Sequence, residues 1–500
     1  MTAIADLRTY LAETEDYRRI FDHLRFDQQS YMPDKATADR ARQLGLMERQ
    51  LRMRTGAPEL GRLIAAVEAT NPDEKTDFPT WAIAHVARRD HETELRRPVD
   101  QLAAFQRTAS EGFLAWRDAR KTSNWAAFAP WLRKIIDINL RLADAIGYAE
   151  HPMDALLSMY EPALSWRETQ VLLDSVRDIV VPLNARRLEI VNSLKPDPMP
   201  VLPRDKVFAF VHDLAKNLGY DWDRGGLSIS PHPFTSPSGA NDVRFTLRDD
   251  VPFSDILKTA VHELGHALYE QGVFPDLWGT SAARGVMPYV HESQAKYWEN
   301  IVGREPEFAV WAYDMLRLYL DDAPAGFGPE ALHRAALYGP TSLIRTGSDE
   351  LSFNLHIILR WEIECALLTG EIDVMDVPAL WNERSLQYFG QKVPDDSVGC
   401  LQDPHWCHRY MGLFTSYTIG NVMSAQFWKT METEGLSVNA ALDARDVSPL
   451  LGWLRRNVHS VGRTYTLTEL VTRVTGSPLS VDAFRAHLDR RYGGTGSAMR

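Results

Sequence analysis

The segment "ILKTAVHELGHALYEQG", residues 256–272, carries His262 and His266 four positions apart, with Glu263 next to the first histidine. On a helix, residues four apart project from the same face, about one turn from each other. Two imidazoles at this spacing can bind one Zn2+, while Glu263 is turned towards the water that completes the coordination. The motif therefore predicts a metal centre in which Glu263 is a general base.

A catalytic zinc site needs a third protein ligand, and the sequence rules out one common source of it. The continuation H-E-x-x-H-x-x-G-x-x-H is absent, because Tyr269 and Gly272 occupy the positions of its glycine and last histidine. The other common solution is a glutamate on a following helix. The segment "PYVHESQAKYWENIVG", residues 288–303, has helical periodicity and offers Glu292.

Two neighbours of Glu292 are alternative ligands. Adjacent helical side chains diverge by about 100°, so His291 and Glu292 cannot both point at the metal. Glu299 lies two turns further along the same face, where a structural salt bridge is the competing role. The residue types alone leave this choice open, with Glu292 favoured over His291.

Local patterns predict the elements that position these residues. A helix is expected from an N-cap near Ser254 to Gly272, so that it carries both histidines. Before it, the segment at positions 243–248 alternates apolar and polar residues with the period of a half-buried strand. In this strand Val243, Phe245 and Leu247 form the apolar face.

Elsewhere the dominant periodicity is helical. In "PWLRKIIDINLRLADAIG", residues 130–147, apolar residues recur at steps of three or four, and Gly147 predicts the end of the helix. Similar helices are expected over most of residues 3–190. The Pro-rich segment 195–205 separates a helical N-terminal part, 1–195, from a second part, 205–500. The fold class predicted is mainly α with a small β element.

Composition excludes several functional classes. A formal net charge of -12 argues against a nucleic-acid surface, and no apolar stretch is long enough to predict a membrane span. The three cysteines are too few for a disulfide framework, and the N-terminal segment is acidic where a signal peptide needs an apolar core. We therefore expect a cytoplasmic protein that binds neither nucleic acid nor membranes.

Several further motifs resemble those of one enzyme family over nearly the whole chain. Together with HELGH and the N-terminal "YMPDKATADRARQL", the chain resembles the carboxypeptidase Taq family of zinc metallocarboxypeptidases, which are gluzincin-type enzymes. The motifs that carry the resemblance, in the order of the family, are "HPF" at 232–234, "DVRFT" at 242–246, "HESQ" at 291–294, "IRTGSD" at 344–349 and "GCLQDPHW" at 399–406.

The resemblance implies a complete set of expectations. His262, His266 and Glu292 would hold one Zn2+, for which Co2+ or Mn2+ could substitute, and Glu263 would be the base. The enzyme would release single residues from peptides with a free C-terminus, with broad specificity. The fold would be that of neurolysin-like zincins, with a deep active-site groove and a small sheet beside the zinc helix. The chain would form one domain over residues 1–500, with HELGH and the later motifs in its second part, and a homodimer.

A carboxypeptidase must also bind the terminal carboxylate of its substrate, and arginine offers two parallel donors for it. Arg345 of "IRTGSD" is the first candidate and Arg244 of "DVRFT" the second, and each could instead be a structural arginine. His232 could line the substrate groove or fix the turn before Pro233. The predicted strand that contains Arg244 could, as an edge strand, pair with an extended peptide.

Two residues near the C-terminal motifs are candidate donors to an oxyanion: His405 and Tyr417. Each could equally be a buried polar residue with satisfied hydrogen bonds. Asp349 could orient Arg345 or a ligand histidine, or it could cap the helix that follows it. Cysteines on either side of His405 do not make a second metal site, because no second cysteine pair exists.

Two other functions compete with an exopeptidase. An endo-acting oligopeptidase on the same fold would differ only in whether the groove is closed beyond the scissile bond. A non-catalytic helical binding protein, stabilised by the metal, is the alternative from another class. The presence of Glu263 argues against it, since a structural site needs no general base.

Overall fold

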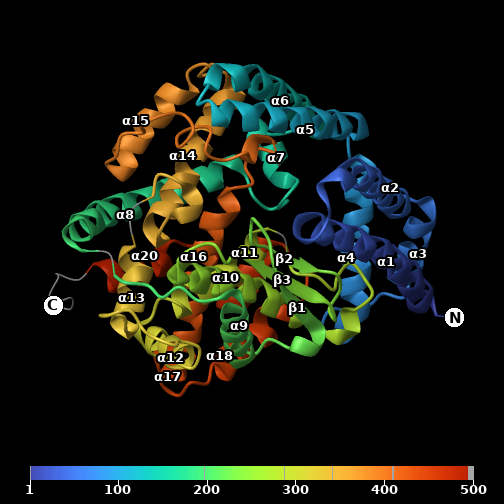
Figure 1. The fold of residues 1–500 in the computed structure, drawn as a ribbon. Coiled ribbons are helices and arrows are strands. Elements are labelled where there is room, and N and C mark those ends of the chain that lie inside the picture. Colours follow the sequence, from blue (N-terminus) through green and yellow to red (C-terminus); the bar gives the residue numbers. More distant parts are fainter. Residues whose placement is uncertain (1, 196, 287, 340–341, 408–409, 494–500) are drawn as a thin grey trace. The chain divides into compact units, whose positions relative to one another are not determined.

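The structure is a computed structural model that describes residues 2–195, 197–286, 288–339, 342–407 and 410–493. It is 68% helical, with a three-stranded sheet, which confirms the predicted mainly-α fold (Figure 1). No helix in these ranges is long and apolar enough to cross a membrane. The cysteines are free thiols, as expected.

The chain divides into two compact units, each assembled from several segments. Unit 1 contains residues 1–97, 197–333 and 427–478, and unit 2 contains residues 98–196, 334–426 and 479–500. One change of unit falls inside the Pro-rich segment 195–205. Helices α13 (Pro329–Tyr338) and α16 (Thr415–Thr433) each continue from one unit into the next.

Unit 1 holds the sheet and the helix that carries HELGH. Its elements are α1 (Ala3–Ser30), η1 (Asp34–Ala36), α2 (Thr37–Thr55), α3 (Pro58–Glu68), α4 (Phe78–Arg96), α9 (Arg204–Leu218), η2 (Trp222–Arg224), β1 (Gly225–Ile229), β2 (Thr235–Pro237), β3 (Val243–Leu247), α10 (Phe253–Gln271), η3 (Pro275–Leu277), α11 (Tyr289–Lys296), η4 (Tyr297–Val302), α12 (Pro306–Leu316), α17 (Val438–Asp443), α18 (Ser448–Leu454), η7 (Arg455–His459) and α19 (Leu467–Thr475). Both η4 and η7 are π-helical turns.

All regular elements in the described part of unit 2 are helices. Its elements are α5 (Val99–Lys121), α6 (Trp125–Ile146), α7 (Pro152–Ser158), α8 (Trp166–Ser193), η5 (Arg345–Gly347), α14 (Glu350–Thr369), α15 (Val377–Phe389), η6 (His405–Cys407) and α20 (Asp482–Tyr492). Helix α6 is the one predicted from the periodicity of residues 130–147. Asn124 caps its start by accepting a hydrogen bond from the Ala127 amide, and Gly147 ends it with a positive φ of 87°.

The sheet corrects one prediction about the strand before the zinc helix. Its order is β1-β3-β2, with β1 parallel and β2 antiparallel to β3. Val243, Phe245 and Leu247 are fully buried, as the alternation predicts. However, β3 is the central strand and not an edge, because β2 folds back along one side of it. The edge of this sheet on that side is therefore β2.

Helices α10 and α11 pack against each other through their backbones. A Cβ atom on Gly265 would lie 2.6 Å from the Cα atom of Ala295 and 2.7 Å from the carbonyl oxygen of Gln294. No side chain larger than hydrogen fits at such separations, so this glycine of HELGH permits the close approach. The start of α10 differs slightly from the prediction: Pro252 is the N-cap, and Ser254 lies inside the helix.

The core of unit 1 surrounds this pair of helices. Leu264 and Leu268 on α10 and Tyr289 on α11 are fully buried, as are Tyr297 and Trp298 of the π-helical turn that continues α11. Because both helices are buried, packing in the core fixes their position relative to each other.

Candidate active site

The three predicted metal ligands converge in unit 1. The Nε2 atom of His262 lies 3.9 Å from Oε2 of Glu292, and Nε2 of His266 lies 3.9 Å from Oε1 of the same carboxylate. One ligand atom from each residue falls within 4.8 Å of the others. Helix α10 supplies the two imidazoles and α11 supplies the carboxylate, so the return helix brings Glu292 to the histidines.

The donor set fits a divalent cation. The Oε2 atom of Glu292 is buried and has no hydrogen-bond partner among the described residues, which is costly for a carboxylate oxygen unless something else binds there. Two ligand atoms about 2.1 Å from a tetrahedral zinc ion are roughly 3.4 Å apart. The observed separations of 3.9 Å are only slightly larger. Two imidazoles and one carboxylate also match a catalytic zinc set, which leaves a position for water.

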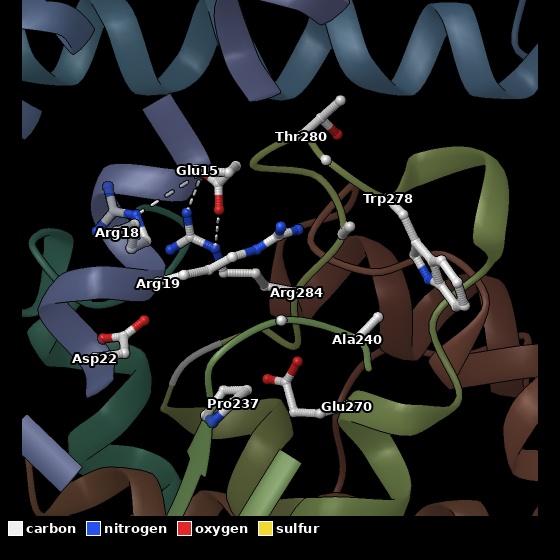
Figure 2. A pocket seen from close by; sticks show the side chains of 13 residues that line it. Glu15, Arg18, Arg19, Asp22, Pro237, Ala240, Glu270, Trp278, Thr280 and Arg284 are labelled. Carbon is white, nitrogen blue, oxygen red and sulfur yellow. Dashed lines mark hydrogen bonds and ion pairs between the residues drawn. The ribbon is translucent and has the colours of Figure 1, made fainter. Parts of the chain in front are cut away.

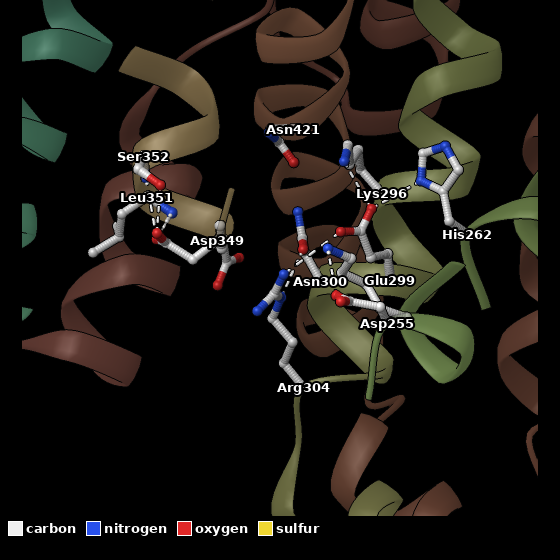
Figure 3. A network of polar contacts seen from close by, with 12 residues as sticks. Asp255, His262, Lys296, Glu299, Asn300, Arg304, Asp349, Leu351, Ser352 and Asn421 are labelled. Atoms are coloured by element: carbon white, nitrogen blue, oxygen red, sulfur yellow. Dashed lines mark hydrogen bonds and ion pairs between the residues drawn. The ribbon is translucent and has the colours of Figure 1, made fainter. Parts of the chain in front are cut away.

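A buried ionic network holds His262 (Figure 3). Its Nδ1 atom lies 2.8 Å from Oε2 of Glu299, which also accepts a 2.7 Å hydrogen bond from Lys296 Nζ. Arg304 lies 3.5 Å from the other carboxylate oxygen. Burial by itself raises the pKa of Glu299, but Lys296 and His262 outweigh it and keep that pKa well below its ordinary value. The predicted salt-bridge role of Glu299 is confirmed, and the same carboxylate also orients His262, one of the predicted ligands.

His266 is held by a different kind of partner. Its Nδ1 atom lies 2.6 Å from Nδ1 of His291, whose Nε2 atom is 2.8 Å from Oε1 of Glu270. Burial and the neighbouring His291 keep the pKa of His266 well below its ordinary value, so the ring is neutral near pH 7. Sequence reasoning did not single out Glu270. Its position four residues after His266, on the same helix face, was the signal that could have identified it.

Glu263 lies next to the ligand triad and receives a hydrogen bond from the sheet. Its Oε2 atom accepts a 2.6 Å bond from the hydroxyl of Thr235 on β2, and its side chain is buried. Burial raises the pKa of Glu263 above its ordinary value, although His262 acts in the opposite direction. A raised pKa lies closer to the value that suits a general base working near neutral pH. Sequence reasoning also missed Thr235, which directly follows the "HPF" motif.

The two other candidates of unit 1 have local partners. Arg244 on β3 makes a bidentate pair with Asp242 at 2.7 and 2.9 Å, and its guanidinium lies 5.5 Å from the centre of the Phe26 ring. His232 is exposed, and its carbonyl oxygen accepts a 2.7 Å hydrogen bond from the Ser230 hydroxyl. These contacts fix the turn and the strand, and they leave the substrate roles of both residues as predictions.

In unit 2, Arg345 lies among aromatic rings and beside a carboxylate. Its Nε atom donates a 2.6 Å hydrogen bond to Oδ2 of Asp403, and its guanidinium is 4.6 Å from the ring centre of Phe414 and 5.4 Å from that of Tyr417. Burial raises the pKa of Asp403, but Arg345 and Arg360 outweigh it and keep this pKa below the usual range. The structure thus brings Arg345 and Tyr417 together, with Asp403 as a partner not predicted for this role.

His405 occupies the same aromatic cluster of unit 2. Its ring stacks on Phe414 with centres 5.0 Å apart, and its Nδ1 atom is 3.3 Å from the carbonyl oxygen of Asp403. Burial, reinforced by Arg360, lowers the pKa of His405 to about 3. The ring is therefore neutral near pH 7, and the carbonyl of Asp403 is the acceptor for its single N–H at Nδ1. The role of His405 as a donor to an oxyanion stays a prediction.

Asp349 caps a helix, which was one of its two predicted roles. Its Oδ1 atom accepts hydrogen bonds of 2.9 and 3.1 Å from the amides of Leu351 and Ser352, at the start of α14. Its other oxygen lies 3.2 Å from the guanidinium of Arg187. The carboxylate is thus held by contacts within unit 2.

Comparison with known proteins identifies the family of this chain. Residues 6–492 match the family described as Carboxypeptidase Taq (M32) metallopeptidase. The chain belongs to the M32 family. This M32 chain is 33% identical to thermostable carboxypeptidase 1 of Thermus thermophilus, over 93% of its length and 94% of the relative. It is 29% identical to carboxypeptidase 1 of Bacillus subtilis, over 97% and 99% of the two chains.

Solved structures show the same M32 fold. The crystal structure of the M32 carboxypeptidase from Deinococcus radiodurans aligns with a TM-score of 0.92 at 32% identity, and covers 98% of this chain and 99% of its own. Together with the named relatives, this makes the M32 protein a metallocarboxypeptidase that acts on peptides. The alternative of a non-catalytic binding protein is set aside.

Proposed function

We propose that this metallocarboxypeptidase uses Zn2+ to release single amino acids from peptide C-termini with broad specificity. The observation that carries the proposal is the convergence of two imidazole Nε2 atoms on the carboxylate of Glu292, with Glu263 on the same helix as the imidazoles. The Oε2 atom of this carboxylate has no hydrogen-bond partner among the described residues. Co2+ or Mn2+ would substitute for Zn2+, because nitrogen and carboxylate donors also suit these ions.

A divalent ion held by His262, His266 and Glu292 would supply Lewis acidity, which activates water and polarises the scissile carbonyl. The protein supplies the proton transfers. Glu263 would accept the proton of the attacking water and deliver it to the leaving amine nitrogen. The hydrogen bond from Thr235 holds that carboxylate in one orientation. Burial, by excluding water, strengthens the electrostatic interactions at this point.

Substrate recognition is assigned mainly to unit 2. We propose Arg345 as the anchor of the terminal carboxylate, with Asp403 positioning the guanidinium. His405 and Tyr417 are the proposed donors to the oxyanion. Arg244 is the weaker candidate for the anchor, because Asp242 already binds it bidentately. His232 remains a proposed groove residue.

Broad specificity is attributed to main-chain recognition. Among the described residues, β2 forms an edge of the sheet, and Thr235 on this strand contacts Glu263. An extended peptide that paired with β2 would be fixed in register by backbone hydrogen bonds, which do not depend on its side chains. The neurolysin-like groove, the homodimer and the cytoplasmic location stay predictions, based on the resemblance and on the low cysteine content.

The experiment compares one peptide in three forms: free acid, C-terminal amide and N-acetylated acid. A carboxypeptidase cleaves both acids one residue at a time and leaves the amide nearly untouched. An endo-acting oligopeptidase cleaves the amide as well as the acids, and internal fragments in the mass spectrum would overturn the proposal. The same assay after chelation, with Zn2+, Co2+ or Mn2+ added back, identifies the metal.

A further inference from the structure

The two ligand histidines of the proposed metal site are held by chemically different partners. Nδ1 of His262 faces the carboxylate of Glu299, whereas Nδ1 of His266 faces another imidazole, that of His291. A second histidine in this position is unusual, because ligand histidines almost always donate to a carboxylate, a backbone carbonyl or water. The contacts from His266 through His291 to Glu270 determine which ring nitrogens carry a hydrogen.

Each ring nitrogen in this chain has a defined role. If Nε2 of His266 binds the metal through its lone pair, Nδ1 of that ring carries the hydrogen and donates it. Nδ1 of His291, 2.6 Å away, must then be the acceptor. A neutral imidazole has a single N–H, which in His291 is consequently at Nε2 and points to Oε1 of Glu270 at 2.8 Å. Both histidines thus have fixed tautomers.

Glu270 is fixed from a second direction. Its Oε1 atom also accepts a 3.1 Å hydrogen bond from the Gly285 amide, in the segment that leads into α11. Nearby, the Val286 amide donates to the Tyr269 hydroxyl at 3.1 Å. These contacts run from α10 to the segment before α11, while His291 on α11 returns to His266 on α10. The two helices that carry the three proposed metal ligands are therefore connected by hydrogen bonds in both directions: from α10 to the segment before α11, and from α11 back to α10.

On its other side, Glu270 lines a charged cavity (Figure 2). The cavity has a volume of about 380 Å³, including solvent at its mouth, and Arg18, Arg284 and Glu15 also line it. Arg284 donates to both carboxylate oxygens of Glu15, through its Nε atom and one terminal nitrogen. Glu270 thus lies between the imidazole pair and a cavity that is lined by charged residues.

We propose that His291 is a positioning residue, which accepts from His266 and donates to Glu270, and thereby fixes the ring of His266 for metal binding. This inference rests on the proposed metal site. It also favours Glu292 over His291 as the third ligand, because Nδ1 of His291 already contacts Nδ1 of His266.

The test compares two replacements of His291. Glutamine can accept through its amide oxygen and donate through its amide nitrogen, so His291→Gln can preserve both bonds, whereas His291→Leu removes both. The readouts are the Zn2+ dissociation constant from chelator competition and the absorption spectrum of the Co2+-loaded protein, which reports the ligand set. The exposed His212, replaced in the same two ways, is the matched control.

We expect the dissociation constant to rise about 10- to 100-fold in His291→Leu, and to stay within about threefold of the original protein in His291→Gln. The Co2+ spectrum of His291→Gln should be unchanged. An unaltered dissociation constant in His291→Leu would overturn the proposal. A rise of the Zn2+ dissociation constant beyond about 1,000-fold in both variants, together with a changed Co2+ spectrum, would also overturn it. His291 would then itself be a metal ligand.

A second pair of variants covers the case in which His291→Leu does not fold. Glu270→Gln keeps an acceptor oxygen for His291 and Gly285, whereas Glu270→Ala removes it. We expect weaker Zn2+ binding in the alanine variant than in the glutamine variant, and equal binding in the two would contradict the chain of donors. Failure of the original protein to bind Zn2+ would instead refute the proposed function. A failure of the proposal for His291 and a failure of the proposed function can therefore be told apart.

Discussion

The hydroxyl of Thr235 lies 2.6 Å from Oε2 of Glu263 and 3.0 Å from the carbonyl oxygen of the same residue. A hydroxyl has one hydrogen, and an ionised carboxylate is the stronger acceptor of the two oxygens. Strand β2 therefore fixes the orientation of the proposed base, although the base belongs to α10. The edge of the small sheet thus contributes directly to the site.

Thr235→Val should lower kcat by roughly 10- to 100-fold and leave bound Zn2+ unchanged. Valine has nearly the same shape but cannot donate, and a hydrogen bond to a charged group contributes roughly 1.5–3 kcal/mol. Steady-state kinetics and metal analysis on the same sample check this. Thr93→Val, at an exposed threonine of the same unit, is the control. Unchanged kcat in Thr235→Val would show that the hydrogen bond does not position the base.

Glu263→Gln should retain Zn2+ and lose turnover by at least about 10²-fold. Glutamine preserves the shape and can still accept a hydrogen bond from Thr235, but it cannot take a proton from water. The measurement is kcat on a free-acid peptide together with the metal content. Near-normal hydrolysis in this variant would remove Glu263 from the mechanism.

Replacing His262 or His266 with alanine should abolish both bound metal and activity, since each change removes one of three protein ligands. Metal content after dialysis against a weak chelator checks the first effect. His212→Ala, at a half-exposed histidine of the same unit, should retain one equivalent of metal. A His262 or His266 variant that also retained it would show that the ion binds elsewhere.

Arg345→Ala should lower kcat/KM on free-acid peptides to about the level that the original enzyme shows on the corresponding amides. Breaking a buried charge pair on one side costs on the order of 2–5 kcal/mol, which is roughly 30- to several-thousand-fold. The loss caused by Arg345→Ala and the loss caused by amidation of the peptide should not add, because both changes remove the same interaction.

Arg345→Lys should recover only part of the activity, since an ammonium lacks the planar fork. Arg133→Ala, at an arginine of unit 2 with a half-exposed side chain, is the control for surface charge. If the losses from amidation and from Arg345→Ala multiply, the carboxylate anchor is another residue, and Arg244 becomes the next candidate.

The buried carboxyl of Glu364 should make the free energy of unfolding depend on pH. This carboxyl of α14 is buried, and burial raises its pKa from 4.5 to about 7, although the Gly412 amide and Trp406 donate to it. Between these values the folded protein keeps the proton and the unfolded chain releases it. Stability should therefore fall as the pH rises through this window, by at most about 1.4 kcal/mol per pH unit, and level off above it.

Glu364→Gln removes this titration. The free energy of unfolding of the variant minus that of the original protein should increase from pH 5 to pH 7 and then stay constant. Urea denaturation at pH 5, 6, 7 and 8 measures it. A difference that does not change with pH would show that Glu364 titrates alike in the folded and unfolded states.

The metal ligands show what local sequence can predict. The spacing of His262 and His266 fixes their common face, because the helical period is the same in any helix. The third ligand depends on how α11 crosses α10, which no local pattern contains. In the structure, Glu292 faces the two histidines of HELGH, His291 faces His266 and Glu299 faces His262. All three candidates contact the site, each in a different role.

The sheet shows the same limit. The alternation at Val243, Phe245 and Leu247 predicts a strand correctly, but strand order is set by pairing between distant segments. Strand β2 has three residues and includes Pro237, so it is too short to show a period. Its place at the edge, and with it the contact of Thr235, could not be found from the sequence.

The backbone contact at Gly265 has a consequence for the choice of ion. Where main chains touch, no rotamer change can adjust the gap, so the three donors are preorganised before an ion arrives. An ion that requires a much shorter or much longer separation between its ligand atoms would have to move two buried helices relative to each other. A residue with no side chain thus limits how far the separation of the three donors can change.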